Sequence, residues 1–500
     1  MKRTLAAAIT LALATTATAE PYQYDLRSRF SRELRMEDLK PGLYLQPRIE
    51  SALMFVGNIN LAQDSADEVD TAGIEFSPGI YASYLSPRAQ AFLDYSLIGR
   101  VFEADEYNGV THLLDTRGTY DVVPEWFKMH GSASYRDTVI DPSRSFNYGG
   151  SGLFAESNLS QTLTASVTPD FSHDFGDFRV DARYTYGRTW FLDQPDSGDA
   201  LIFSQYQDDS IDQLLYTSVG TRRENRSLSA RVFYEWQNSD FERTVDYQYE
   251  RAGAEAGWRL SRTLSFVADG GLESDLDEST VAGGLDETFW HAGLEWRPDE
   301  RTLLDARYGE RFFGDSWRVN VRRETKYVTL RASYIEDPEV ETRRVGLNLD
   351  PGEIPVPDPG FDLSGFTSFP YVRKDAEFSV LAEGARTKLR FDVYNRQREY
   401  INDFPPDEER QGGQFNVLRD LGAHLYAEFD ARYEDVFAGG RTLGQTNPFL
   451  YQFYDWNATG RLSWEVYSNF LASAEAGYLK RTGDTEYDGA WLAFRVRYTF

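Results

Sequence analysis

Charged side chains recur at every second position in many short segments of this 500-residue sequence. Asp181 and Arg183 show the pattern, and Asp305 and Arg307 repeat it. On an extended strand, side chains two positions apart point to the same side. Such groups can form ion pairs within a strand and with its neighbour, and a row of arginine side chains can bind carboxylate, sulfate or phosphate groups. Both interpretations, structural ion pairs and an anion path, stay open from the sequence alone.

The residues that this alternation places on the inner side of predicted strands, as candidates for lining a lumen, are Arg179, Asp181, Arg183, Arg231, Arg259, Asp305, Arg307, Arg331, Arg390, Asp392, Arg461, Glu475, Arg495 and Arg497. Over all predicted strands, basic residues on that side outnumber acidic ones, although the whole chain has 52 basic and 80 acidic residues. We therefore expect a mildly basic interior and acidic loops, the latter illustrated by Glu336, Asp337, Glu339, Glu341, Asp407, Glu408 and Glu409.

Short motifs of enzymes and metal sites are missing from the sequence. The five histidines, which form no HExxH motif, are His112, His130, His173, His291 and His424. There is also no G-x-S-x-G elbow and no phosphate-binding loop. The absence of cysteine excludes thiolate zinc sites, haem attachment and iron–sulfur clusters. The acidic run Asp275–Glu278 lacks the glycine and terminal glutamate of an EF-hand loop. We expect no enzyme, no metal and no cofactor, although active-site residues on separate strands would escape a search by spacing.

The last ten residues show most clearly which elements must position these charges. Leu492, Phe494, Val496, Tyr498 and Phe500 alternate with Ala493, Arg495, Arg497 and Thr499. A strand that is apolar on one face and charged on the other suits the wall of an outer-membrane β-barrel, with lipid outside and a polar interior. The same alternation recurs along the chain, for example in Phe178–Tyr186 and Leu228–Trp236.

The connections between these segments alternate in length. Ser86–Arg88 and Ser468–Asn469 are short, whereas Gly57–Thr71 and Glu336–Pro370 are long. Outer-membrane barrels have short periplasmic turns and longer extracellular loops. The sequence therefore predicts an all-β fold over residues 44–500, a single closed antiparallel transmembrane β-barrel of about 20 strands, roughly 18 to 22. Its long extracellular loops should be acidic.

The N-terminal residues predict export. Lys2 and Arg3 precede the apolar run Leu5–Leu13 and the small residues Ala17–Ala19, a pattern typical of a signal peptide over residues 1–19. We interpret residues 20–43 as a periplasmic tail. No later run approaches eighteen apolar residues, so we expect no transmembrane helix. The formal charge of −28 argues against nucleic acid as a partner. The expected location is the outer membrane of a Gram-negative bacterium, with outer-membrane lipid and the barrel assembly machinery as partners.

Two stretches carry a family resemblance. They are PRIESALMFVGNINLA, Pro47–Ala62, and EFSPGIYASYLSPRAQAFLDYSL, Glu75–Leu97, and the hairpin residues His112–Leu114 and Val123–Trp126 fit them. From about Tyr44 onward the chain resembles the outer-membrane β-barrel family associated with PEP-CTERM/exosortase systems, which is similar to the wider group of β-barrel porins. Members accompany exopolysaccharide machinery, so the resemblance implies a surface or export role. Together with the predicted inward arginines, it makes an anionic polysaccharide a candidate partner. It provides no catalytic residues.

Three functions are compatible with these observations. The first is a channel or export conduit, the second is a structural or surface-binding barrel with a closed lumen, and the third is a barrel-embedded hydrolase. A wide lumen would favour the first, inward side chains or a folded-in loop the second, and a Ser/His/Asp cluster near the rim the third. The proline-rich loop Glu336–Pro370 either folds inward and narrows the pore or stands out in solvent.

The chain end supplies the first prediction. Tyr498 and Phe500 resemble the sorting signature that the assembly machinery of bacterial outer membranes reads. Replacing Phe500 with serine, or deleting it, should lower barrel assembly while export continues, because recognition follows translocation. Fractionation of cells measures this, and a normal outer-membrane level of the variant would contradict it.

Overall fold

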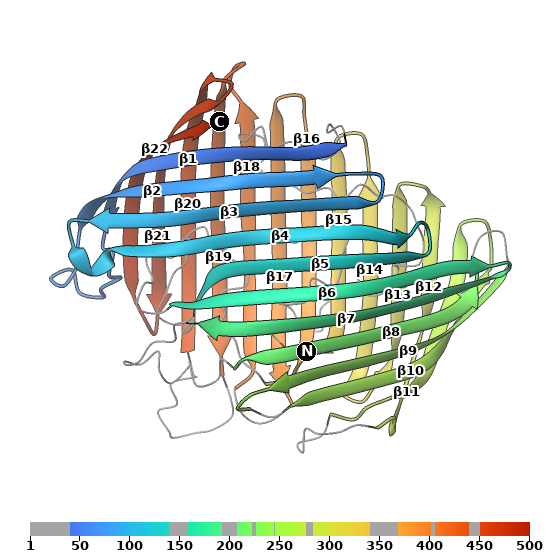
Figure 1. Ribbon diagram of the computed structural model, residues 1–500. Coiled ribbons are helices and arrows are strands. Elements are labelled where there is room, and N and C mark those ends of the chain that lie inside the picture. The colour runs from blue at the N-terminus through green and yellow to red at the C-terminus, as the bar shows by residue number, and fades with distance from the viewer. Residues whose placement is uncertain are drawn as a thin grey trace.

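In the computed structural model, the described residues are 41–139, 159–192, 208–222, 227–244, 246–276, 284–340, 369–401, 406–439 and 451–500. They form a single 22-stranded sheet in which each strand pairs with its sequence neighbours. The last strand pairs antiparallel with the first, from Arg48↔Thr499 to Gly57↔Ala490, so the sheet closes into a barrel (Figure 1). The predicted all-β antiparallel barrel is confirmed, with a strand number at the upper end of the expected range.

The strands are β1 (Gly42–Gly57), β2 (Thr71–Leu85), β3 (Ala89–Phe102), β4 (Gly109–Val123), β5 (Phe127–Val139), β6 (Leu159–Phe175), β7 (Phe178–Leu192), β8 (Ser210–Thr221), β9 (Leu228–Phe241), β10 (Tyr247–Arg259), β11 (Leu264–Glu273), β12 (Glu287–Asp299), β13 (Thr302–Arg311), β14 (Gly314–Glu324), β15 (Val328–Glu339), β16 (Tyr371–Glu383), β17 (Thr387–Tyr400), β18 (Glu408–Asp420), β19 (Leu425–Ala438), β20 (Tyr451–Tyr467), β21 (Phe470–Gly483) and β22 (Tyr487–Thr499). One 3₁₀ turn, η3 (Asp105–Tyr107), follows β3. In the part of the chain that the structure describes, no helix is long and apolar enough to span a membrane.

Alternation along each strand gives the wall two different faces. On β22, Leu492, Phe494 and Val496 are exposed on the outer face, whereas Arg495 and Arg497 form ion pairs on the inner face. Large apolar side chains are exposed on the outer faces of strands around the whole barrel. An apolar outer surface around a charged interior lets lipid surround the wall while water or polar groups occupy the inside.

The two ends of the barrel differ in their connections. The turns that join β2 to β3, β4 to β5, and so on to β21 lie at the end where β1 begins and β22 stops, and they are short. We name this the periplasmic end and the other the extracellular end. The longest connections, 140–158 and 340–370, lie at the extracellular end, but there β13 and β14 are joined by Phe312 and Phe313 alone.

Some acidic residues assigned to loops from the sequence belong to strands. Glu336, Asp337 and Glu339 lie in β15, and Glu408 and Glu409 lie in β18, because both strands continue past the predicted boundaries. The first strand begins at Gly42, just before the expected start of the barrel. The predicted signal peptide, residues 1–19, and residues 20–40 of the predicted tail lie outside the described residues.

Phe500 lies beside the start of the first strand. Its backbone N–H donates a hydrogen bond to the carbonyl oxygen of Pro47 at 2.9 Å. Its ring meets the ring of Tyr498 edge-on, with 4.9 Å between the centroids. Both aromatic rings are exposed, and they therefore extend the apolar outer surface to the end of the chain.

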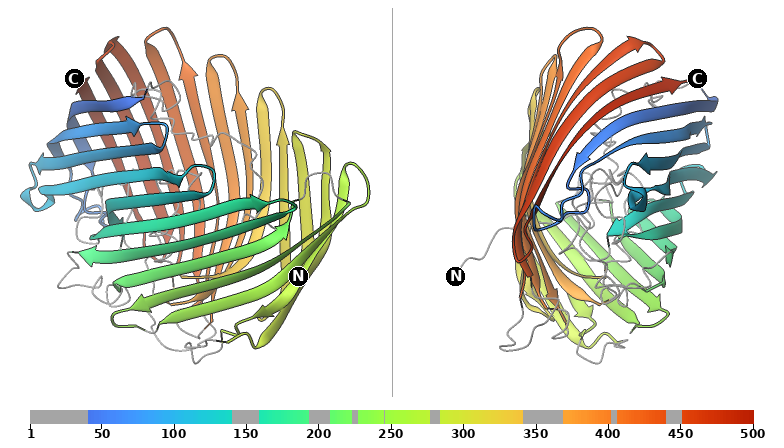
Figure 2. Two further views of the ribbon diagram at one scale, coloured as in Figure 1. Left: turned by 45° about the vertical axis from the view of Figure 1, so that its right-hand side comes forward. Right: turned by 90° about the vertical axis from the view of Figure 1, so that its left-hand side faces the viewer.

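The barrel has two broad walls, β1–β9 in front and β14–β22 behind in Figure 1, whose strands cross in projection (Figures 1 and 2). They join at β22–β1 and through β10–β13, and close approach of the backbones marks the second junction. A Cβ atom on Gly309 would lie 1.7 Å from the carbonyl oxygen of Trp290, and one on Gly293 would lie 2.0 Å from that of Ala306. Only glycine fits where a neighbouring backbone comes this near.

Gly309 therefore supplies a test of the junction. Gly309→Ala should reduce the fraction of protein that folds, because the added methyl group collides with the β12 backbone. The heat-modifiable band on a semi-native gel measures the folded barrel. Gly460→Ala is the matched control, since a Cβ atom there meets nothing within 4 Å. Equal folding of the two variants would contradict the prediction.

Candidate functional site

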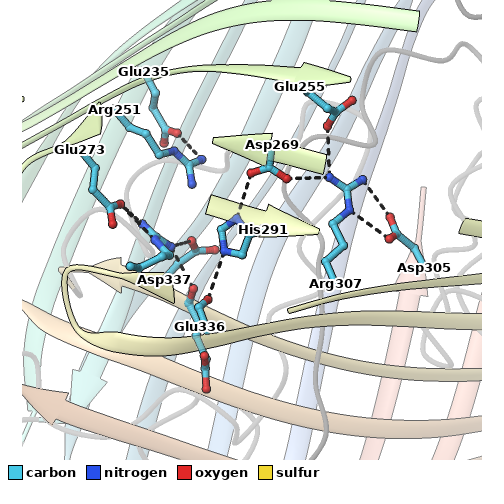
Figure 3. A network of polar contacts seen from close by, with 12 residues as sticks. Glu235, Arg251, Glu255, Asp269, Glu273, His291, Asp305, Arg307, Glu336 and Asp337 are labelled. Atoms are coloured by element: carbon cyan, nitrogen blue, oxygen red, sulfur yellow. Dashed lines mark hydrogen bonds and ion pairs between the residues drawn. The ribbon is translucent and has the colours of Figure 1, made fainter. Parts of the chain in front are cut away.

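Buried charges gather on the inner face of β9–β15, and Arg307 on β13 is one centre of this network (Figure 3). Its Nη1 lies 3.2 Å from Glu255 Oε2 and 3.1 Å from Asp269 Oδ1, while its Nε lies 3.1 Å from Asp305 Oδ1. A single guanidinium group thus holds carboxylates from β10, β11 and its own strand. Glu255 also pairs with Arg231 at 3.2 Å.

Arg311 is a second centre, closer to the extracellular rim. Its Nη2 donates to the hydroxyl oxygen of Tyr249 at 2.7 Å, its Nε donates to Glu273 Oε2 at 3.1 Å, and its Nη1 donates to Asp337 Oδ1 at 2.8 Å. The side chains of Arg311 and Glu273 are almost completely buried, at 1% and 0% exposure. These contacts connect β10, β11, β13 and β15 through side chains alone.

A chain of three polar groups crosses the same region. His291 Nδ1 lies 2.9 Å from Asp269 Oδ2, and His291 Nε2 lies 3.4 Å from Ser316 Oγ. The three residues come from β11, β12 and β14, and all are buried or nearly so. Between His291 and Ser316 the sheet contains Gly309 of β13, and its lack of a side chain lets the two meet. The sequence search missed this group because no spacing motif links residues on separate strands.

The strand register places every candidate lumen residue from the sequence on the inner side of the barrel. They are Arg179, Asp181, Arg183, Arg231, Arg259, Asp305, Arg307, Arg331, Arg390, Asp392, Arg461, Glu475, Arg495 and Arg497. Arg231, Asp305 and Arg307 belong to the network of β9–β15. The others are distributed around the wall, so the structure does not bring the whole set to a single site. Their part in a solute path remains a prediction.

Most of the distributed residues have carboxylate or guanidinium partners nearby. Arg179 pairs with Asp181 at 2.9 Å, Arg183 with Asp170 at 2.9 Å and Arg390 with Asp392 at 2.7 Å; Arg461 pairs with Glu475. At the barrel closure, Arg495 Nη1 lies 2.6 Å from Glu75 Oε1 and 3.4 Å from Glu50 Oε1. Arg497 Nε lies 2.7 Å from Glu50 Oε2. Arg259 and Arg331 are exposed.

The expected basic excess is not found on the described inner faces. Acidic and basic residues are there in roughly equal numbers, because carboxylates such as Asp337, Glu408 and Glu434 lie on strands. Arg410 lies beside Glu408 and Glu434, and Arg481 pairs with Asp455 at 2.6 Å. The inner wall is therefore a mosaic of both signs.

Exposure on the inner face falls toward the extracellular end. Inner side chains nearer the periplasmic end keep contact with solvent, for example Arg390 at 40% and Arg322 at 36%. Near the extracellular end, Tyr249 and Tyr371 are buried at 1% and 0% exposure. The lumen side of the wall is thus open to water at one end and packed at the other.

Apolar side chains account for part of this closure. Ile59 and Leu61 of the β1–β2 connection pack with the inward-facing Met54 and Trp491. Val340, the first residue after β15, is completely buried in a cluster with Tyr247, Tyr249 and Leu276 of β10 and the β11–β12 connection. The acidic, proline-rich loop thus begins turned inward, and its residues 341–368 lie outside the described part.

Among the described residues, no group of three or more His, Asp or Glu side chains is arranged to hold a metal ion. Of the acidic run Asp275–Glu278, residues 277 and 278 lie outside the described part of the chain.

The fold and its inner wall can be compared with known proteins. The sequence matches no protein-family model and no curated protein. The FrpB iron transporter from Neisseria meningitidis (F5-1 variant) is 10% identical, with 92% of this chain and 83% of that chain covered and a TM-score of 0.48. A mutant of the ferric enterobactin receptor PfeA from Pseudomonas aeruginosa is 10% identical over 92% of this chain and 81% of that chain, with a TM-score of 0.46.

OmpT with loop L8 deleted, an outer-membrane protein of Vibrio cholerae, is 11% identical over 92% of this chain and 99% of that chain, with a TM-score of 0.31. Such similarity concerns general barrel architecture, and no residue role passes from these proteins to this chain. The closed sheet with its apolar exterior and charged interior indicates the location. The chain is an outer-membrane β-barrel.

The network of β9–β15 predicts unequal effects of removing arginines. Arg307→Ala should lower the free energy of unfolding by about 3–5 kcal/mol, because it leaves buried carboxylates without their cation. Arg331→Ala should change it little, because Arg331 is exposed and forms no ion pair with any described carboxylate. Urea unfolding in detergent micelles, followed by tryptophan fluorescence, measures both. Similar losses would show that the network does not stabilise the wall.

Proposed function

We propose that this barrel is a gated channel or export conduit of the outer membrane. The observation that carries the proposal is the difference between the two ends of the inner wall. A charged, solvent-exposed surface at the periplasmic end continues into a packed extracellular end where Tyr249, Tyr371 and Val340 are buried. A passage that is hydrated on one side and closed on the other suits a conduit that opens only with its cargo or partner.

The chemistry of the wall supports a hydrated, polar cargo. Arginine and carboxylate groups alternate along the inner faces, so a passing molecule meets hydrogen-bond donors and acceptors of both signs. The resemblance of Pro47–Ala62 and Glu75–Leu97 to the family associated with PEP-CTERM/exosortase systems favours a surface exopolysaccharide. Carboxylate groups of an anionic polysaccharide could exchange with the wall carboxylates as partners of the arginines.

The buried extracellular end also favours a second candidate function, a structural or surface-binding barrel whose lumen stays closed. In that case the connections at the rim, including Asn58–Asp70 packed on the inner wall, would form the binding surface. The two functions differ in whether the closure can be removed to give a conducting pore.

Conductance in planar bilayers separates them. The native barrel should conduct weakly, and deletion of Val340–Gly365 should raise the single-channel conductance because it removes the buried Val340 together with most of its loop. Deletion of Asp64–Asp67, exposed residues of the β1–β2 connection, should leave the conductance unchanged. Equal conductance of native and Val340–Gly365-deleted barrels would favour the closed, surface-binding barrel.

The same preparation tests the anion path. In the deleted form, replacing Arg495 and Arg497 with serine should shift the reversal potential in a salt gradient toward cation preference, because both lie on the inner face at the closure and neutralise Glu50 and Glu75. An unchanged reversal potential would contradict a part for these arginines in an anion path. Binding of an anionic polysaccharide, measured as block of the current, would identify the cargo class.

A further inference from the structure

We propose that Ser316 is the nucleophile of an ester-hydrolysing site in the barrel wall, with His291 as its base and Asp269 as the residue that positions His291. The inference does not depend on the channel function, because it rests only on the positions of these three side chains near the extracellular rim and on the order in which they contact one another. Ser316 Oγ lies 3.4 Å from His291 Nε2, and His291 Nδ1 lies 2.9 Å from Asp269 Oδ2. A serine hydroxyl, the two ring nitrogens and a carboxylate in this order are what activation of a serine requires.

The carboxylate of this group is itself held in place. Asp269 Oδ1 accepts a hydrogen bond from Arg307 Nη1 at 3.1 Å, which leaves Oδ2 directed at His291. Arg307 is fixed in turn by Asp305 and Glu255. Asp269 can therefore keep the proton on Nδ1, and Nε2 remains free to accept the serine proton.

The wall is discontinuous beside Ser316. β14 and β15 pair only from Val319↔Tyr334 to Glu324↔Thr329, although β14 begins at Gly314 and β15 continues to Glu339. Gly314–Arg318 still pairs with β13 and Ile335–Glu339 with β16, but the two segments do not pair with each other, and we name them the β14–β15 gap. Side chains take the place of ladder bonds there: Arg311 Nη1 donates to the carbonyl oxygen of Glu336 at 3.2 Å.

The backbone N–H next to the nucleophile donates to the carboxyl group of a side chain. Trp317 N donates to the side-chain oxygen Oε2 of Glu336 at 2.9 Å, in the β14–β15 gap. Ester hydrolysis needs a donor for the oxyanion that forms on the substrate carbonyl, and an N–H adjacent to the nucleophile suits that role. The Glu336 carboxylate thus stands where the oxyanion would be stabilised, and it must leave before a substrate can react.

A positively charged side chain, that of Arg318, lies on the same inner face of the barrel as Ser316. Arg318 is two positions from Ser316 on the inner face of β14 and forms no ion pair with any described carboxylate. It is near enough to Asp269 and Asp337 to interact with them electrostatically. Its charge can therefore also favour an oxyanion at Ser316.

The outer surface beside the gap indicates the class of substrate. Trp290, Tyr308 and Trp317 form an exposed aromatic row, with ring centroids 6.0 Å and 4.6 Å apart. This row lies near the extracellular ends of β12–β14, where the wall faces the outer leaflet. Aromatic rings at that level contact amphipathic molecules. The substrate class is therefore a carboxylic ester with an apolar acyl chain that reaches Ser316 through the β14–β15 gap.

The reaction balances with the residues present and water. Ser316 Oγ attacks the ester carbonyl carbon while its proton passes to His291 Nε2, and the tetrahedral intermediate expels the alcohol, which takes that proton. Water then attacks the acyl-serine, loses a proton to His291 and releases the carboxylic acid, and Ser316 recovers its proton.

Labelling of the purified barrel in micelles with a biotinylated fluorophosphonate tests the proposal, because this probe reacts with activated serines. Peptide mapping should locate the label on Ser316, and Ser316→Ala should lose it. His291→Ala should slow labelling by about a hundredfold. Glu336→Ala should speed it by about tenfold, because the Trp317 N–H becomes available. A p-nitrophenyl decanoate substrate should be cleaved faster than p-nitrophenyl acetate.

Ser333→Ala is the matched control, because Ser333 lies on the inner face of β15 within the paired segment, and its labelling should equal that of the native barrel. The heat-modifiable band shows that each variant is folded. Label on a serine other than Ser316, or no label in both the native and the Glu336→Ala forms, would overturn the proposal. Conductance is a separate readout, so the channel function can fail or hold regardless of this result.

Discussion

The rest of this structure depends on the requirement that backbone N–H and C=O groups in lipid find partners within the protein. A sheet meets it only when it closes, and here β22 pairs with β1 along the whole stretch from Arg48↔Thr499 to Gly57↔Ala490. Closure of the sheet then determines which kind of side chain each face of a strand can have. Every strand has one face toward lipid, and most of the charges on strands are on the other face, where carboxylates and arginines neutralise one another.

The same requirement explains why the β14–β15 gap matters. Where the ladder stops, the Glu336 side chain accepts the hydrogen bond of Trp317 N–H, and Arg311 donates to the Glu336 carbonyl oxygen. These two backbone groups have partners, but the partners are side chains that can rotate away. Such a joint can open at lower cost than a strand pair, because no register has to be broken.

Alternation at period two was sufficient to predict the faces. It placed Arg495 and Arg497 inside and Phe494 and Val496 outside, and it gave the all-β barrel with nearly the right number of strands. It could not give distances between strands. Asp269, His291 and Ser316 meet because of the register of β11 to β14 and the missing side chain of Gly309, neither of which is written in a local pattern. The alternation also could not predict where strands end. Asp337 and Glu408 were assigned to loops because they are charged, but a charged residue on the inner face does not end a strand.

The ion pair between Arg495 and Glu75 has a consequence for the order of events in time. Arg495 is on β22 and Glu75 is on β2, so the contact at 2.6 Å passes over β1, whose Glu50 also lies beside Arg495. β22, which is synthesised after β1 and β2, thus contacts both of these earlier strands together. This favours a sequence of assembly in which the β1–β2 hairpin is already in register when β22 arrives. The hairpin then acts as a template, and a barrel with a displaced β1–β2 hairpin would stay open even if β22 itself is intact.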